Sequence, residues 1–251
     1  MSPWVQALAA AVLTPGFAVA ALATAVAGLM RGYAGFGTAV LLAPIFATIW
    51  GPRAGVPIML LMELFVSAQL LPRAFRDADQ RVMLPIGLAA VIATPLGAWV
   101  LLHADGGQLR RSIGALVLGF GLLLLSSWRY HGARPLSLNL AVGTVSGLLK
   151  GATGMSGPPV ILYLLSGPEE ARRHRANLIL FFGVIGIVSV IPPVLGGLVD
   201  QLTLLRTAAL LPVMLFCVPI GARLFTVVPE RFYRRFALVA LVSAGGIALL
   251  A

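Results

Sequence analysis

Two basic residues stand directly in front of glycine clusters at corresponding places in the chain. Arg31 precedes the cluster at residues 32–37, and Lys150, the only lysine, precedes the cluster at 151–157. Glycine lets the backbone approach a ligand closely, and helix starts present N–H groups with the positive end of the helix dipole. We expect the glycine clusters to interrupt helices, and two cations beside two such helix breaks predict a site for an anionic substrate. The alternative is that each cation reaches toward a membrane interface or marks a helix end.

Hydroxyl side chains and glycines complete this predicted site. Hydroxyls can donate to an anion, although isolated serine and threonine residues in membrane helices often serve packing alone. The residues expected to bind the substrate are Arg31, Gly35, Gly37, Thr38, Lys150, Thr153, Gly154, Ser156 and Gly157.

Glu63 is a carboxylate inside an apolar run at residues 58–68. An ionisable group at membrane depth is a candidate functional group by default. We expect Glu63 to carry a coupling proton or to pair with Arg31. The alternative is a tilted helix that places Glu63 nearer the membrane surface. The matching place in the second half of the chain holds Phe181 and Phe182 instead of a carboxylate.

The composition is that of a membrane protein. Of 251 residues, 59% are hydrophobic and 10% charged, whereas soluble domains are about one quarter charged. Apolar runs such as 82–102 and 204–225 have the length of about 20 residues that crosses a bilayer as a helix. The runs lack the alternation of a β-barrel. We therefore predict an all-α, polytopic membrane protein whose single transmembrane domain covers residues 1–251.

Charge and motif content exclude other classes. The net charge of +10 comes from arginines clustered between apolar runs, which fits contact with lipid headgroups better than nucleic-acid binding. Cys217 is the only cysteine, and the three histidines lack metal-ligand spacing. No nucleophile elbow or nucleotide phosphate loop is present. The sequence predicts neither an enzyme nor a metal or cofactor protein.

An internal repeat divides the chain. Residues 28–37 match residues 147–156 at an offset of 119, and residues 95–98 match residues 219–222 at an offset of 124. The order of the matches is kept, so we infer two homologous halves at about 17–130 and 136–251.

Each half contains five apolar segments. In the first half they are 17–30, 38–50, 54–71, 82–102 and 112–127; in the second they are 138–149, 158–166, 178–195, 204–225 and 236–251. The two segments beside each glycine cluster look too short for full spans. They predict either a re-entrant hairpin or a pair of tilted helices broken at membrane depth.

Loop charges predict that the halves have opposite orientations. Arginines follow the third segment in the first half, but precede it in the second half: Arg73, Arg76 and Arg81 against Arg172, Arg173 and Arg175. Because positive loops stay cytoplasmic, equivalent loops then lie on opposite sides, as in inverted-topology repeats. Both termini are expected outside. The pair Arg110 and Arg111 also falls outside and breaks the rule.

The two copies at 28–44 and 147–159, with the elements at Pro95 and Pro219, resemble the duplicated glycine-rich motif of the sulfite exporter TauE/SafE family. The resemblance implies a multi-pass carrier of the bacterial inner membrane. It would move sulfite, sulfonates such as sulfoacetate, or other small anions with the proton gradient. Met155 and Ser156 replace the Phe36 and Gly37 of the first copy, so the exact anion stays open.

The expected function is secondary transport that exports a small oxyanion, with broken helices from the two halves cradling the anion. A passive anion channel and a membrane enzyme or assembly factor are the alternatives. The expected partners are the anion and the lipid bilayer, without nucleic acid, and a homodimer is left open.

Overall fold

The computed structural model describes residues 11–125, 130, 132, 135–165 and 170–225, and within these ranges every regular element is a helix. The helices are α2 (Pro15–Ala34), α3 (Thr38–Trp50), α4 (Pro52–Asp77), α5 (Gln80–His103), α6 (Gly106–Leu125), α7 (Leu136–Thr153), α8 (Gly157–Leu165), α9 (Ala171–Leu195) and α10 (Gln201–Leu224). The predicted all-α fold is confirmed. The expected segment at 236–251 lies outside the described residues.

Five of these helices are long and apolar enough to cross a membrane: Pro15–Ala34, Pro52–Pro72, Gln80–His103, Arg172–Leu195 and Gln201–Leu224. Helix α5 shows how such a span meets lipid. Its side chains Leu84, Leu88, Ile92 and Leu96 follow one another at every fourth position, and each is between 61% and 68% exposed. An apolar stripe of this kind suits a hydrocarbon solvent, so the chain is a polytopic membrane protein.

The first apolar segment is longer than expected. We expected it to end at the glycine cluster, but α2 continues through Gly28 and Gly32 to Ala34 and reaches 20 residues. The glycines stay helical because α10 packs directly on them: a Cβ at Gly32 would lie 2.0 Å from the carbonyl oxygen of Val218. The prediction that this segment is too short to span is therefore wrong. Among the described helices, α3 with 13 residues and α8 with 9 are short, and α7, with 18, is not one of the five candidate spans.

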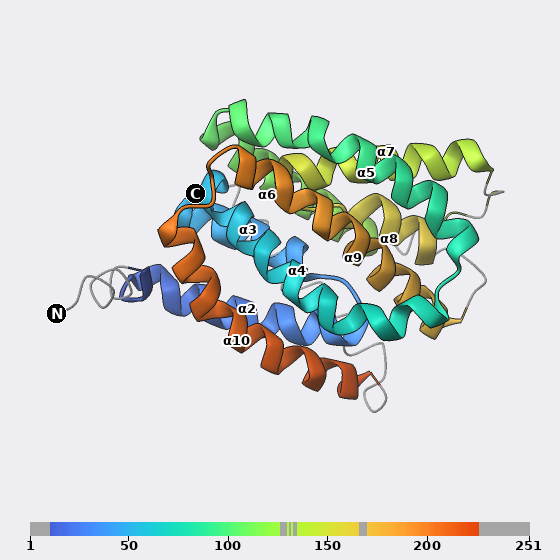
Figure 1. Cartoon of the computed structure of the whole chain (residues 1–251), viewed down its shortest axis with the longest axis horizontal. Coiled ribbons are helices and arrows are strands. Elements are labelled where there is room, and N and C mark those ends of the chain that lie inside the picture. Colours follow the sequence, from blue (N-terminus) through green and yellow to red (C-terminus); the bar gives the residue numbers. More distant parts are fainter. Residues whose placement is uncertain (1–10, 126–129, 131, 133–134, 166–169, 226–251) are drawn as a thin grey trace.

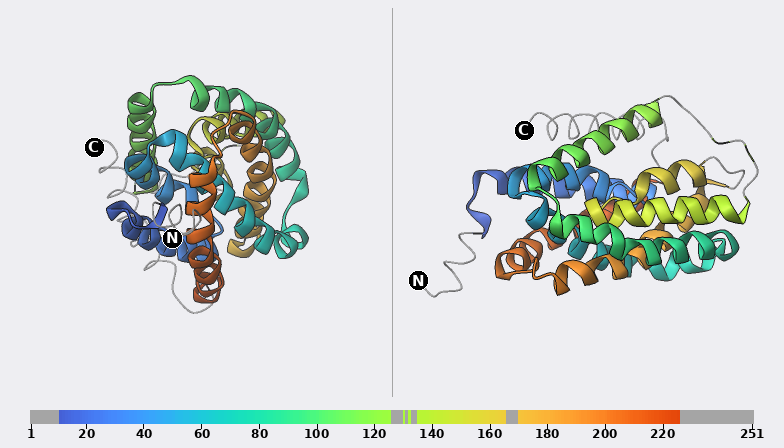
Figure 2. Two further views of the ribbon diagram at one scale, coloured as in Figure 1. Left: turned by 60° about the vertical axis from the view of Figure 1, so that its left-hand side comes forward. Right: turned by 90° about the horizontal axis from the view of Figure 1, so that it is seen from above.

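Helices from the two halves are interleaved. Figure 1 shows α4 and α9 side by side, between the pair α5 and α7 and the pair α2 and α10. In each outer pair one helix comes from the first half and one from the second. The long helices run roughly along one common axis, as the two views of Figure 2 show.

The two outer pairs make equivalent contacts. A Cβ at Gly97 of α5 would lie 2.0 Å from the carbonyl oxygen of Leu148 in α7, and a Cβ at Gly221 of α10 would lie 2.2 Å from that of Leu29 in α2. The sequence repeat pairs Gly97 with Gly221 and Leu29 with Leu148. The glycine of each half therefore packs on the equivalent leucine of the other half. Along the colour gradient of Figure 1, α2, α4 and α5 run opposite to α7, α9 and α10 respectively.

This close packing leads to a first prediction. Gly97→Ala should lower the stability of the protein by about 1–3 kcal/mol, because the added methyl group meets backbone that cannot move aside. Gly87→Ala, in the same helix, is the matched control, since a Cβ there has open space. It should be neutral or slightly stabilising through helix propensity. Thermal unfolding of both variants in detergent makes the comparison, and equal melting temperatures would contradict it.

Candidate functional site

Two cations from different halves meet on one carboxylate in the interior. Glu63 lies near the middle of the span Pro52–Pro72 of α4 and is 2% exposed. Lys150, in the last turn of α7, donates from Nζ to Oε2 of Glu63. Nη1 of Arg31, in the last turn of α2, lies 4.0 Å from Oε1 of the same carboxylate. We call Arg31, Glu63 and Lys150 the charge triad.

Burial of the charge triad is nearly complete, since both cations are 0% exposed. Charges removed from water need partners, because an uncompensated buried ion costs several kcal/mol. Arg31 has additional ones: Nη1 donates to the carbonyl oxygen of Gly35 at 2.8 Å, and Nη2 donates to Oγ of Ser67 at 3.2 Å. The ring of Phe182 covers its guanidinium, with 5.0 Å from Cζ to the ring centroid. With these groups ionised, the triad keeps one excess positive charge.

The sequence repeat explains the asymmetry of the triad. The offset of 119 residues pairs Arg31 with Lys150 and Glu63 with Phe182. Lys150 contacts Glu63, while Arg31 contacts Phe182. Equivalent side-chain contacts are thus made twice, once with a carboxylate and once with an aromatic ring. Glu63 is buried between helices near the middle of an apolar span, the position that the expectation of an intramembrane carboxylate requires.

Two predicted site glycines end the helices that carry the cations. Gly35 has φ 79° and Gly154 has φ 76°, a left-handed conformation that favours glycine. The N–H of Gly35 donates to the carbonyl oxygen of Arg31 at 2.9 Å, and that of Gly154 to the carbonyl oxygen of Lys150 at 2.8 Å. These two N–H groups close the ends of their own helices, so they are not the free anion donors that we expected.

The predicted hydroxyl residues divide into two kinds. Oγ1 of Thr38 and Oγ of Ser156 have no hydrogen-bond partner among the described residues, although the side chains are only 1% and 0% exposed. Buried polar groups are nearly always paired, so these two hydroxyls are available to a ligand, as are the Nε of Arg31 and the Oγ of Ser146, which also lack a partner among the described residues. Thr153 instead serves its own turn, since its hydroxyl donates to the carbonyl oxygen of Leu149 at 2.7 Å.

The short helices α3 and α8 begin at these unused hydroxyls. Gly37, with φ 108°, precedes the first residue of α3, Thr38, while α8 begins at Gly157 directly after Ser156. The first N–H groups of a helix have no carbonyl partner within it. The first turn of α3 contains no proline, so all of its N–H groups are present. In α8 two prolines follow Gly157, and each lacks an N–H group.

Three residues of the interior were not predicted as part of the site. Ser67 follows Glu63 by one helical turn, and that spacing was the signal for it. The sequence singled out Phe182 only because the repeat pairs it with Glu63. Arg175 had been assigned to loop charge, yet its Nη2 and Nε donate to the carbonyl oxygens of Gly32 and Tyr33, at 2.6 Å and 3.1 Å. It thereby satisfies the negative end of α2.

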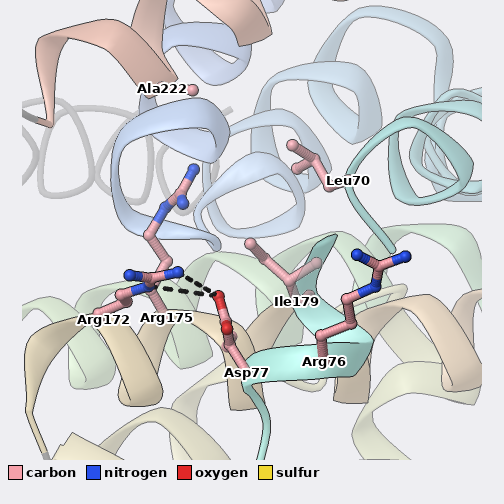
Figure 3. Close-up of a pocket in the computed structure, with 9 residues that line it drawn as sticks. Leu70, Arg76, Asp77, Arg172, Arg175, Ile179 and Ala222 are labelled. Atoms are coloured by element: carbon pink, nitrogen blue, oxygen red, sulfur yellow. Dashed lines mark hydrogen bonds and ion pairs between the residues drawn. The ribbon is translucent and has the colours of Figure 1, made fainter. Parts of the chain in front are cut away.

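A cavity of about 390 Å³ opens where the last turns of α4 meet the first turns of α9. Figure 3 shows three of its arginines, Arg76, Arg172 and Arg175, and the ion pair between Arg172 and Asp77. The cavity borders the turn after Arg31, because a Cβ at Gly35 would lie 3.1 Å from the side chains of both Arg175 and Ile179.

These features define a polytopic α-helical membrane protein with a charged site in its interior. The family model of the sulfite exporter TauE/SafE matches residues 20–248. The chain belongs to this family, which confirms the resemblance seen in the sequence, and it is a multi-pass protein of the bacterial inner membrane.

A curated relative is similar over a large part of the chain. It is the probable sulfite/organosulfonate exporter TauE of Cupriavidus necator, which is 26% identical over 194 residues, covering 74% of each protein. No solved structure matches the chain.

The charge triad leads to a second prediction, on stability. Glu63→Ala should destabilise the protein by about 3–5 kcal/mol, because two buried cations lose their carboxylate. Adding Lys150→Ala should recover part of that loss. A double-mutant cycle on chemical unfolding measures the coupling, and additivity within about 0.5 kcal/mol would refute it. The exposed pair Arg172 and Asp77, 3.1 Å apart, is the control and should couple by about 1 kcal/mol or less.

Proposed function

We propose that the protein is a secondary transporter that exports a small sulfur oxyanion or an organosulfonate, such as sulfite or sulfoacetate. The family and the name of the curated relative support the class of substrate. The observation that carries the proposal is the charge triad, because its excess positive charge is buried near the middle of a span. An intramembrane charge of this kind is costly and marks the path of an ion.

The anion would neutralise the excess charge between Arg31 and Lys150. The unpaired hydroxyls of Thr38 and Ser156 would donate to its oxygens, together with first-turn N–H groups that follow Gly37 in α3. Gly157 would let the start of α8 approach the ligand. In this proposal Gly35, Thr153 and Gly154 shape the turns that hold these donors.

Alternating access would come from the two halves. Two observations support inverted-topology repeats: the equivalent glycine–leucine contacts between the halves, and the opposite directions of corresponding helices. In other transporters such repeats rock around a central site. The antiparallel packing of α4 and α9 brings the end of α4, with Arg76, beside the start of α9, with Arg172, at one end of the bundle in Figure 1. We propose that this end is cytoplasmic, because positive loops stay on that side.

The membrane potential would favour export. A potential that is negative inside drives an anion outward with about 2.3 kcal/mol per charge per 100 mV. The proton gradient would act through Glu63, the buried carboxylate within the described spans. Protonation of Glu63 would remove one of the two charges that compete for Arg31 and Lys150.

The third prediction tests the substrate site. Lys150→Ala should abolish sulfite or sulfonate flux in proteoliposomes, because the variant site no longer carries excess positive charge. Arg53→Ala is the control, since Arg53 is exposed at the first turn of α4, and it should keep normal flux. Size-exclusion profiles check that both variants fold. Unchanged flux in a folded Lys150→Ala protein would remove Lys150 from the mechanism.

The fourth prediction tests proton coupling. Glu63→Gln keeps the shape of the side chain but cannot exchange a proton near neutral pH. An imposed pH gradient should change net alkylsulfonate flux through the wild type and leave that through Glu63→Gln unchanged. Glu63→Gln also removes the negative charge beside two buried cations, so size-exclusion profiles must first select folded variant protein. Substrate exchange across equal concentrations should persist in that protein. A wild type that ignores the gradient, or a variant that follows it, would show that Glu63 is not the coupling group.

A further inference from the structure

The cavity at the ends of α4 and α9 is separate from the charge triad and carries its own charge pattern. Arg76, Arg172 and Arg175 line it together with one carboxylate, Asp77. Arg172 is already engaged, since its Nη2 and Nε donate to Oδ2 of Asp77 at 3.1 Å and 3.3 Å. Arg76 is exposed and shows no ion pair within the described residues. The cavity lining is therefore positive in excess.

Asp77 is the partner of one of these arginines. Figure 3 shows its carboxylate turned toward Arg172, while the guanidinium of Arg76 points away from it. The carboxylate thus occupies the place that an incoming anion would take beside Arg172. Because Arg172 and Asp77 are partly exposed to water, their ion pair is weak and open to exchange.

The interior of the cavity is apolar. Leu70, Ala74, Ala176 and Ile179 contribute to its lining beside the arginines. An anion with a short hydrocarbon chain fits such a surface better than a bare inorganic ion, because the chain can leave water. The chemistry of the cavity therefore matches an organic oxyanion with a sulfonate-type or phosphate-type head.

The cavity also lies next to the central site. Arg175 and Ile179 line it and contact Gly35, and the carbonyl oxygen of Gly35 accepts from Arg31 of the charge triad. One layer of side chains therefore links the cavity lining to the first cation of the triad.

We propose that this cavity is a second anion site, a vestibule in which Arg76 and Arg172 capture the substrate before it reaches Arg31 and Lys150. This rests on the proposed transport function and adds to it a substrate preference, for sulfonates with a short apolar chain. A positively lined cleft raises the local concentration of anions and speeds their capture, an effect that salt weakens. Asp77 acts as an internal competitor for the captured anion.

Ethanesulfonate flux in proteoliposomes of zwitterionic lipid tests the vestibule. Arg76→Gln and Arg172→Gln should each raise KM roughly tenfold at low ionic strength, and added salt should shrink this difference. Asp77→Asn should lower KM, because Arg172 loses its competitor. Arg173→Gln is the matched control, since Arg173 is an exposed neighbour of Arg172 on α9 that does not line the cavity. Its KM should equal that of the wild type.

Three outcomes would overturn the proposal. An Arg173→Gln effect as large as that of Arg76→Gln would show general surface charge only. Unchanged KM values in both cavity variants, with normal wild-type flux, would remove the vestibule and leave the transport function intact. Vesicles containing phosphatidylglycerol would reveal a lipid headgroup as the occupant if they raise the wild-type KM and leave Arg76→Gln unaffected.

Direct binding separates this proposal from the transport function. Titration calorimetry of ethanesulfonate on purified Lys150→Ala protein measures the vestibule without the central site. Binding should persist there and disappear on adding Arg76→Gln and Arg172→Gln. If the wild type moves no anion but this binding pattern holds, transport fails and the vestibule stands. Absence of binding, or binding that ignores the arginines, would refute the vestibule.

Discussion

The rest of the site depends on one buried interaction, in which the carboxylate of Glu63 holds Arg31 and Lys150 from opposite halves of the chain. Neither cation could stay buried without a partner, because the free energy lost by removing an unpaired charge from water exceeds the free energy gained from packing its side chain. The carboxylate neutralises one of the two positive charges. Hydrogen bonds to Gly35 and Ser67 and the face of Phe182 hold Arg31 without adding negative charge. The excess positive charge that remains is the physical basis of the proposed anion site.

Close helix packing brings these charges together. Two glycines allow close approach of neighbouring helix backbones. Gly97 brings α5 against Leu148 of α7, and Gly221 brings α10 against Leu29 of α2. In a membrane, where burial from water does not drive helix association, such contacts between small residues supply much of the attraction. Because each pair joins one helix from each half, neither half completes its own packing. The ends of α2 and α7, with their cations, are thereby fixed against α4.

Several features of the site followed from local sequence alone. Arg31 and Lys150 were found because they recur at one offset in front of glycines, and Glu63 because it interrupts an apolar run. Arg175 could not be found in this way, since the sequence pattern assigned its arginine cluster to a loop, whereas the structure places it in α9, where it donates to the carbonyl oxygens of Gly32 and Tyr33. The glycine turns were located correctly, but the N–H groups of Gly35 and Gly154 close helices instead of facing a ligand.

The sequence by itself determined the membrane class, the helical fold and the family, because the length of the apolar segments and the spacing of the glycine motifs can be read directly from the chain. Only the tertiary structure decided that Arg31 and Lys150 share Glu63, that the ring of Phe182 covers Arg31, and that Thr38 and Ser156 have hydroxyls without a partner among the described residues. These facts depend on how each helix is rotated and how closely it approaches its neighbour. Contacts between residues more than a hundred positions apart set that geometry, and the pattern within one segment does not contain it.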